Sequence, residues 1–180
     1  LMTWSAGQKE FMPLLMAFYC LSGPPQNVVN RKEYEYIILE EPEMGLHPLA
    51  IQTIILQMIE FIHAGYKVIV STHSPVLLEF VWAYNYLKSI PEDKRVGALC
   101  EVFGIQSSKK YNLNFLNDIY EKDIKTYYFS RDTSGKVNAK DISSLDVYSE
   151  DVAINEWGGL TQFSSKANEV VSKYMAQYGE

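Results

Sequence analysis

The clearest hydrophobic pattern in the chain lies between Pro48 and Gly65. Apolar side chains recur there every three or four residues, the spacing of a helix with one apolar face. They are Ile51, Ile54, Ile55, Met58, Ile59 and Ile62. Proline suits the first turn of a helix and glycine suits the residue after its end. The pattern predicts a helix that begins at Pro48 and stops at Gly65.

Two short apolar runs lie on either side of this helix. Residues 36–39 read Tyr-Ile-Ile-Leu, and residues 67–70 read Lys-Val-Ile-Val. Unbroken apolar runs of this length are typical of strands that are buried on both faces, as in parallel sheets. The order strand, helix, strand predicts a parallel pair with a right-handed crossover. We therefore expect the carboxyl ends of both strands at one edge of the sheet, where ligands bind in such folds.

Helices are also predicted before and after this unit. Apolar residues at helical spacing between Phe11 and Phe18 indicate a helix that stops at residues 22–25. Pro13 removes a backbone hydrogen bond, so we expect either a bend there or a helix that begins near Met12. Ser74 and Pro75 suit the N-cap and first turn of a helix that runs to about residue 87.

The pattern weakens after residue 90. Residues 91–123 mix charges with a helical stretch around Leu113, Leu116 and Ile119. Residues 126–129 and 136–139 predict a hairpin around the turn at 132–135. Residues 157–159, Trp-Gly-Gly, predict a hinge or cap. A final helix is indicated by Phe163, Ala167, Val170, Val171 and Tyr174. We expect one partial domain, with a core at 1–90, a helical insertion at 91–123, and a hairpin and C-terminal helix at 124–180.

Composition narrows the function classes. The 180 residues are 47% hydrophobic and 21% charged, which is typical of a globular chain. A net charge of −6 excludes a large basic surface that could hold nucleic acid through its phosphates. The longest apolar run, residues 11–21, is shorter than the roughly 20 residues that cross a bilayer. We expect no membrane partner and a cytoplasmic location.

Further expectations concern the ends of the chain and its cysteines. The chain begins with Leu1 and lacks a secretory signal pattern, so we expect a fragment of a longer protein. Cys20 and Cys100 lie in apolar surroundings, without a second pair or a histidine cluster nearby. We expect both to be buried free thiols.

Candidate chemistry is concentrated at the two strand ends. Glu40 and Glu41 follow the first strand, and two adjacent acids there could serve a magnesium–phosphate site, one holding the metal and the other orienting water. The alternative is an acidic surface loop. His73 follows the second strand, where it could contact a terminal phosphate; the alternative is a polar strand cap.

A third candidate is the segment Ser5-Ala6-Gly7-Gln8, which opens the first predicted helix. Its backbone N–H groups and the positive end of the helix dipole would favour an anion, with Ser5 and Gln8 adding donors. Most small-residue turns before helices are only turns, and that alternative stays open.

Taken in order, these segments resemble the motifs of a known family. Trp4-Ser5-Ala6-Gly7-Gln8 resembles the signature loop of ABC-type ATPase heads, Tyr36 to Glu41 their Walker B strand, Pro42 to His47 their D-loop, and Thr72-His73 their H-switch. As a set, the motifs are most similar to bacterial AAA-family ATPases grouped with the OLD-like proteins, several of which serve in phage defence. The resemblance covers residues 4–80; the remaining hundred residues resemble such heads only loosely.

The resemblance implies the C-terminal portion of an α/β, parallel-sheet P-loop NTPase head that uses ATP and Mg²⁺. It implies that Glu41 is the catalytic base or water-orienting carboxylate, that Glu40 is the acid on the metal side, and that His73 senses the γ-phosphate. Ser5, Gly7 and Gln8 would press on ATP held by the opposite subunit of a homodimer.

The sequence departs from the family pattern in several places. Ala6 replaces a glycine, Trp4 a leucine, and Glu40 an aspartate. No G-x-x-x-x-G-K-[ST] motif occurs, so we expect the Walker A strand and loop to come from an upstream half of the same protein. The edge of the second strand, residues 68–70, would then be bare.

These departures keep other functions open. The chain could be a catalytically inactive regulatory or binding module of the same fold. A nuclease of the OLD type would need a following acidic metal-binding domain, and the carboxylates after residue 90 are scattered. A nucleic acid or effector protein as partner is not determined by the sequence.

Overall fold

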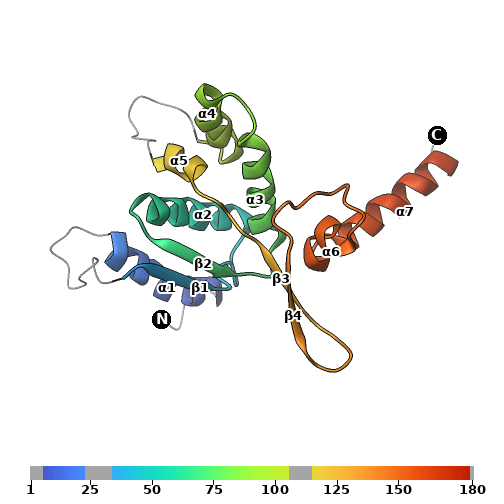
Figure 1. Ribbon diagram of the computed structural model, residues 1–180, viewed down its shortest axis with the longest axis horizontal. Helices are drawn as coiled ribbons and strands as arrows, with labels where there is room; N and C mark the ends of the chain where they lie inside the picture. The colour runs from blue at the N-terminus through green and yellow to red at the C-terminus, as the bar shows by residue number, and fades with distance from the viewer. Residues whose placement is uncertain (1–5, 23–33, 106–114, 179–180) are drawn as a thin grey trace. The chain divides into compact units, whose positions relative to one another are not determined.

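A computed structural model of the chain describes residues 6–22, 34–105 and 115–178. The described residues form two compact units (Figure 1). The first contains those up to residue 77 together with residues 86–122, and the second contains residues 78–85 and those from 123 onward. Ser5 and Leu113 lie outside the described residues. The number of domains stays a prediction.

A parallel pair of strands is the centre of the first unit. β1 (Tyr36–Glu40) pairs with β2 (Lys67–Ser71), with Tyr36 opposite Lys67 and Glu40 opposite Ser71. α2 (Pro48–His63) connects them, and Figure 1 shows it lying along the pair. The predicted strand, helix, strand order and the parallel pairing are confirmed.

Local sequence signals account for the start and the end of α2. The Nδ1 atom of His47 accepts a hydrogen bond from the Leu49 N–H at 3.3 Å, and Pro48 occupies the first helical position. Gly65, with φ of 96°, follows the helix in the left-handed region that glycine favours. The predicted bounds of this helix are confirmed within two residues.

α3 (Pro75–Leu87) also begins where the sequence predicts. The hydroxyl oxygen of Ser74 accepts a hydrogen bond from the Val76 N–H at 3.3 Å, which satisfies one of the free donors of the first turn.

α1 (Ala6–Ser22) keeps Pro13 in its interior. Of the two alternatives, the start near Met12 is therefore wrong, and the bend at Pro13 stays a prediction. Proline removes one backbone hydrogen bond, but packing of the apolar side can outweigh that loss. The ring of Phe18 packs edge-on against Phe61 of α2 at 5.3 Å between centroids. Beyond it, the Gln57 side chain donates a hydrogen bond to the Ser22 hydroxyl at 3.0 Å.

Burial alternates along β1, so the prediction of a strand buried on both faces is wrong for the described residues. Ile37 and Leu39 are buried, whereas Ile38 is 72% exposed. The helix α2 covers one face with the buried side chains Ile51, Ile54, Ile55, Met58, Ile59 and Phe61. Burying one such side chain stabilises the fold by roughly 1.5–3 kcal/mol, so this face carries most of the strand's packing energy.

Residues 92–102 and 115–121 are helical, which includes the predicted helical stretch at Leu116 and Ile119; that residues 91–123 form an insertion stays a prediction. They form α4 (Glu92–Val102), α5 (Phe115–Asp118) and the 3₁₀ turn η2 (Ile119–Glu121). α5 packs against α2 and α4. Leu99, Leu116 and Ile119 are almost completely buried.

The two cysteines differ in burial. Cys100 is buried and free, as predicted, but Cys20 lies on the exposed side of α1, so the expectation of two buried thiols is wrong for Cys20. Burial raises the pKa of the Cys100 thiol. Within the described residues, no helix has both the length and the apolar character needed to span a bilayer.

The second unit contains the predicted hairpin. β3 (Tyr127–Arg131) pairs antiparallel with β4 (Val137–Asp141), with Phe129 opposite Ala139. In the connecting turn, Oδ1 of Asp132 accepts hydrogen bonds from the Ser134 N–H at 2.9 Å and the Lys136 N–H at 3.0 Å. These contacts explain why the polar residues 132–135 form the turn.

The core of the second unit is made by Leu78, Ile142, Leu145 and Trp157. The indole N–H of Trp157 donates a hydrogen bond to the Leu145 carbonyl at 3.1 Å. The short helix α6 (Val152–Asn155) and the 3₁₀ turn η3 (Trp157–Gly159) precede α7 (Gln162–Tyr178). The predicted final helix is present, but its apolar face is not buried in the described residues: Phe163 is 85% exposed.

Candidate functional site

The carboxyl ends of β1 and β2 lie next to each other in the first unit. Glu40 is paired in register with Ser71, and the Glu41 N–H continues the ladder with a hydrogen bond to the Ser71 carbonyl at 2.9 Å. Both loops that follow the strands therefore start from the same edge, as the parallel arrangement predicts.

Glu41 and His73 meet at this edge. Oε1 of Glu41 lies 3.5 Å from Nε2 of His73. The His73 side chain is 83% exposed and that of Glu41 38% exposed, so a ligand can reach both. Their contact brings a proton acceptor and an imidazole together, a combination suited to orienting water beside a phosphate.

The backbone of Glu41 is in an uncommon conformation. Its φ is 42°, in the left-handed region that residues with a Cβ seldom adopt. Such a conformation costs about 1–3 kcal/mol, and residues that keep it cluster at functional sites. In this conformation the chain changes direction after β1, so the backbone of Glu41 no longer follows the strand.

Glu40 is not brought together with the other two residues. It is exposed, and by the alternation of the strand it lies on the same face of β1 as Ile38, away from α2. The described residues contain no group of three histidine, cysteine or acidic side chains that could enclose a metal ion. Glu40 fits Mg²⁺ only in the open manner usual for nucleotide sites, in which one or two carboxylates act with waters and phosphate oxygens.

Of the predicted anion-binding segment, Gly7 and Gln8 are described and Ser5 is not. Gly7 lies in the first turn of α1, and a Cβ at this position would be 2.3 Å from the Gly45 carbonyl oxygen. Only glycine allows so close an approach. The first turn of α1 is thus packed against the loop between β1 and α2.

Glu43 is a residue that sequence analysis missed. Its Oε1 accepts a hydrogen bond from the Thr72 hydroxyl at 2.5 Å and another from the His73 N–H at 2.9 Å. It thereby joins the loop after β1 to the loop after β2. The available signal was a third acid in the stretch that begins at Glu40, although nothing in the sequence indicates its partner.

The other two histidines have local roles. His47 caps α2, as described above, and Nδ1 of His63 lies 2.6 Å from Oδ2 of Asp118. This contact joins α2 to α5, so His63 has a structural role.

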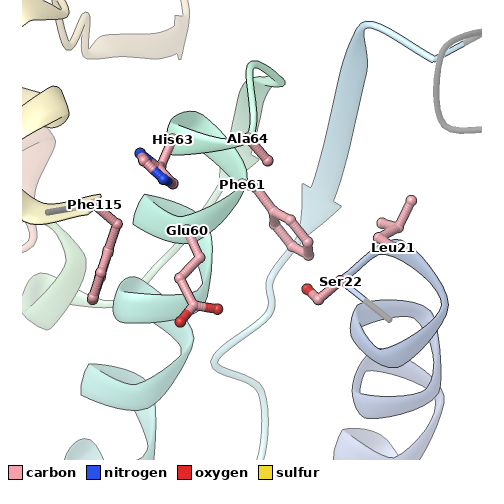
Figure 2. Close-up of a pocket in the computed structure, with 7 residues that line it drawn as sticks. All are labelled: Leu21, Ser22, Glu60, Phe61, His63, Ala64 and Phe115. Carbon is pink, nitrogen blue, oxygen red and sulfur yellow. The ribbon is translucent and has the colours of Figure 1, made fainter. Parts of the chain in front are cut away.

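Figure 2 shows a pocket of about 270 Å³ at the C-terminal end of α2. It is lined by Leu21, Ser22, Glu60, Phe61, His63, Ala64 and Phe115. It contains none of the residues predicted from the motifs. The strand edge with Glu41 and His73 therefore remains the candidate site, because it combines both predicted catalytic side chains.

Two comparisons with known proteins each give a match. Residues 2–79 match the family described as "AAA domain, putative AbiEii toxin, Type IV TA system". The Old nuclease of Escherichia phage P2 is 29% identical over 82 residues, which is 46% of this chain and 14% of that relative. The chain thus spans about one seventh of the relative's length. No solved structure matches the chain.

Residues 2–79, which the family model matches, contain β1, α2, β2 and the candidate site. This part of the chain is similar to an AAA/ABC-type ATPase domain and to a protein of the OLD-like group.

Proposed function

We propose that this chain supplies the Walker B, H-switch and signature parts of an ATP-hydrolysing head. The observation that carries the proposal is the 3.5 Å approach of Glu41 Oε1 to His73 Nε2 at the shared edge of two parallel strands. ATP would lie across this edge, with its terminal phosphate within reach of both side chains.

In this proposal Glu41 orients the attacking water and accepts its proton, while the His73 ring donates a hydrogen bond to the terminal phosphate. Glu40 would hold Mg²⁺ together with phosphate oxygens and water. The bound metal would supply neutralisation of the charge that develops on the phosphates. The exposure of Glu40 and His73 leaves both open to a ligand.

The remaining contacts to ATP would come from outside these residues. A phosphate-cradling loop is needed for tight binding, and we assign it to an upstream half of the same protein. The segment Ser5, Gly7 and Gln8 would face ATP bound by a second subunit, so that ATP holds a homodimer together. Such a head could act in phage defence or in work on DNA, with a nucleic acid or an effector protein as its target.

A second candidate is a catalytically inactive regulatory module of the same fold. The position of Glu40 favours it, because the strand alternation places Glu40 on the face with Ile38 rather than with Glu41. Ala6 and Glu40 also depart from the residues usual at these motif positions. The name of the phage relative records a nuclease, which gives a third activity to be assayed.

The test compares Glu41→Gln with Glu101→Gln in protein that includes the phosphate loop. Glu101 is an exposed glutamate on α4 and lies outside the site, so its variant controls for loss of a carboxylate. Glu41→Gln should lower ATP turnover about 100-fold or more, because a general base is lost. It should also retain ATP-dependent dimers, as measured by light scattering, while Glu101→Gln resembles wild type.

Each other outcome has a clear meaning. Unchanged turnover in Glu41→Gln removes this residue from the proposed role. ATP binding without turnover in the wild type supports the regulatory module. Metal-dependent cleavage of plasmid DNA by the wild type would assign a nuclease activity instead.

A further inference from the structure

Glu43 lies two residues after Glu41, in the loop between β1 and α2. One oxygen of its carboxylate, Oε1, accepts two hydrogen bonds from the loop that follows β2. The donors are the Thr72 hydroxyl at 2.5 Å and the His73 N–H at 2.9 Å. Charged acceptors make stronger hydrogen bonds than neutral ones. A single side chain thus fixes the distance between the two loops of the candidate site.

The contacts continue from Glu43 into α3. The Thr72 hydroxyl also accepts a hydrogen bond from the Ser74 N–H at 2.9 Å, and Ser74 caps the first turn of the helix through Val76. The backbone of residues 72–74 is therefore held on both sides. By contrast, the His73 ring is exposed, and Glu41 is the one described acid that an ion-pair contact joins to it.

The second carboxylate oxygen of Glu43 lies in an energetically unfavourable position. Oε2 is buried and has no hydrogen-bond partner among the described residues. Burying a carboxylate oxygen without a partner is unfavourable. A carboxylate that served only as a surface charge would be more stable if both of its oxygens were in contact with water. Glu43 as a whole is half-buried, and its buried oxygen is consistent with a carboxylate that is kept for its contacts to Thr72 and His73.

We propose that Glu43 is a positioning residue that holds the backbone of His73 so that its ring stays beside Glu41. In this role Glu43 touches neither the reacting phosphate nor the water. The consequence for catalysis rests on the proposed ATPase function, whereas the consequence for the loop does not.

The first test measures the loop in this chain without nucleotide. Amide hydrogen exchange of His73, followed by NMR, should become about two- to tenfold faster in Glu43→Ala, because one hydrogen bond to a carboxylate is lost. Glu43→Gln keeps an oxygen that accepts the same bonds and should exchange within about twofold of wild type. Glu101→Ala serves as the matched control.

A second variant covers the case in which Glu43→Ala does not fold. Thr72→Val keeps the shape of the side chain and removes the hydroxyl, so it breaks the link between Glu43 and Ser74. The Ser74 amide should then exchange faster as well. Unchanged exchange of His73 in folded Glu43→Ala, or of Ser74 in Thr72→Val, would overturn the proposal.

The second test measures catalysis in protein that includes the phosphate loop. Glu43→Ala should lower kcat about tenfold and change KM for ATP less than about twofold, because a misplaced sensor affects the reacting geometry more than binding. Glu43→Gln should restore kcat to within about threefold of wild type. A raised KM with unchanged kcat would contradict a positioning role.

The two tests separate the proposals. If the wild-type protein does not turn over ATP, the ATPase proposal fails, yet the exchange of His73 still shows whether Glu43 holds the loop. If exchange responds as expected and kcat does not, Glu43 is a structural link and the positioning role is rejected.

Discussion

The backbone of Gly7 lies against the carbonyl oxygen of Gly45, so closely that a Cβ on residue 7 would be 2.3 Å from that oxygen. This contact joins the first turn of α1 to the loop between β1 and α2. Two glycines that lie far apart in the sequence thus allow these two segments to approach closely.

Replacing Gly7 by alanine should therefore destabilise the protein. The neighbouring atom belongs to the backbone and cannot move aside as a flexible side chain can, so we expect a loss of about 1–3 kcal/mol in the free energy of unfolding. Urea denaturation measures it. Gly97→Ala in α4 is the control, because a Cβ there meets no atom within 4 Å. It should instead stabilise by about 0.5–1 kcal/mol. Equal effects of the two substitutions would argue against the close contact.

A similar pair of glycines tests the turn after Trp157. A Cβ on Gly158 would be 2.5 Å from Cδ2 of Tyr128, whereas one on Gly159 would meet nothing within 4 Å. Both residues have positive φ, so each alanine substitution costs about 1–2 kcal/mol in backbone strain. In thermal denaturation, Gly158→Ala should therefore lower the stability of the protein more than Gly159→Ala does. Equal losses of stability in the two variants, or a larger loss in Gly159→Ala, would show that Tyr128 does not pack on this turn.

The turn of the hairpin should give a measurable acid response. The Ser134 hydroxyl, followed by the backbone N–H groups of Ser134 and Lys136, lowers the pKa of Asp132 below its ordinary value of 3.8. A lowered folded pKa means that this contribution is complete above the unfolded pKa and is lost as pH falls through the folded value. We expect the hairpin to weaken only in acid, below about pH 4.

Ser134→Ala provides the direct check by NMR titration. It should move the pKa of Asp132 back toward 3.8 and leave that of Asp141 in place, because Asp141 owes its lowered pKa mainly to the Ser143 hydroxyl. If both carboxyls shift together, or neither does, the assignment to the Ser134 contact is incorrect.

The two thiols should differ in reactivity. Cys20 is exposed and Cys100 is buried with a raised pKa, so at neutral pH a thiol reagent should modify Cys20 first. Cys20→Ser should remove the fast phase, and denaturation should be required for rapid reaction of Cys100. A fast phase that persists in Cys20→Ser would mean that Cys100 is accessible.

The elements with local signals were predicted well. Pro48 marks the start of α2, and Ser74 and Pro75 mark that of α3, because capping and first-turn preferences depend on neighbouring residues alone. The meeting of Glu41 and His73 could also be predicted, since parallel pairing places the ends of both strands at one edge.

Long-range packing explains what was missed. The part of α1 before Pro13 lies against the loop between β1 and α2, where Gly7 meets Gly45, and no local pattern indicates that contact. The hydrogen bonds of Glu43 to Thr72 and His73 connect residues 29 and 30 positions apart, and no local pattern announces them. The exposure of Ile38 and Glu40 was missed because residues 36–39 form an unbroken apolar run, which hides the alternation of the strand.

The most direct test of a shared ATP site is a double-mutant cycle on Glu41 and His73 in protein that includes the phosphate loop. Glu41→Gln, His73→Ala and the double variant are compared in single-turnover ATP hydrolysis. Side chains that act as a unit have non-additive effects, so the double variant should be no slower than the slower single variant within about threefold. The account is contradicted if the rate of the double variant is reduced by the product of the two single reductions, or if the single variants have wild-type rates. Either result would show that the two residues do not act on one nucleotide.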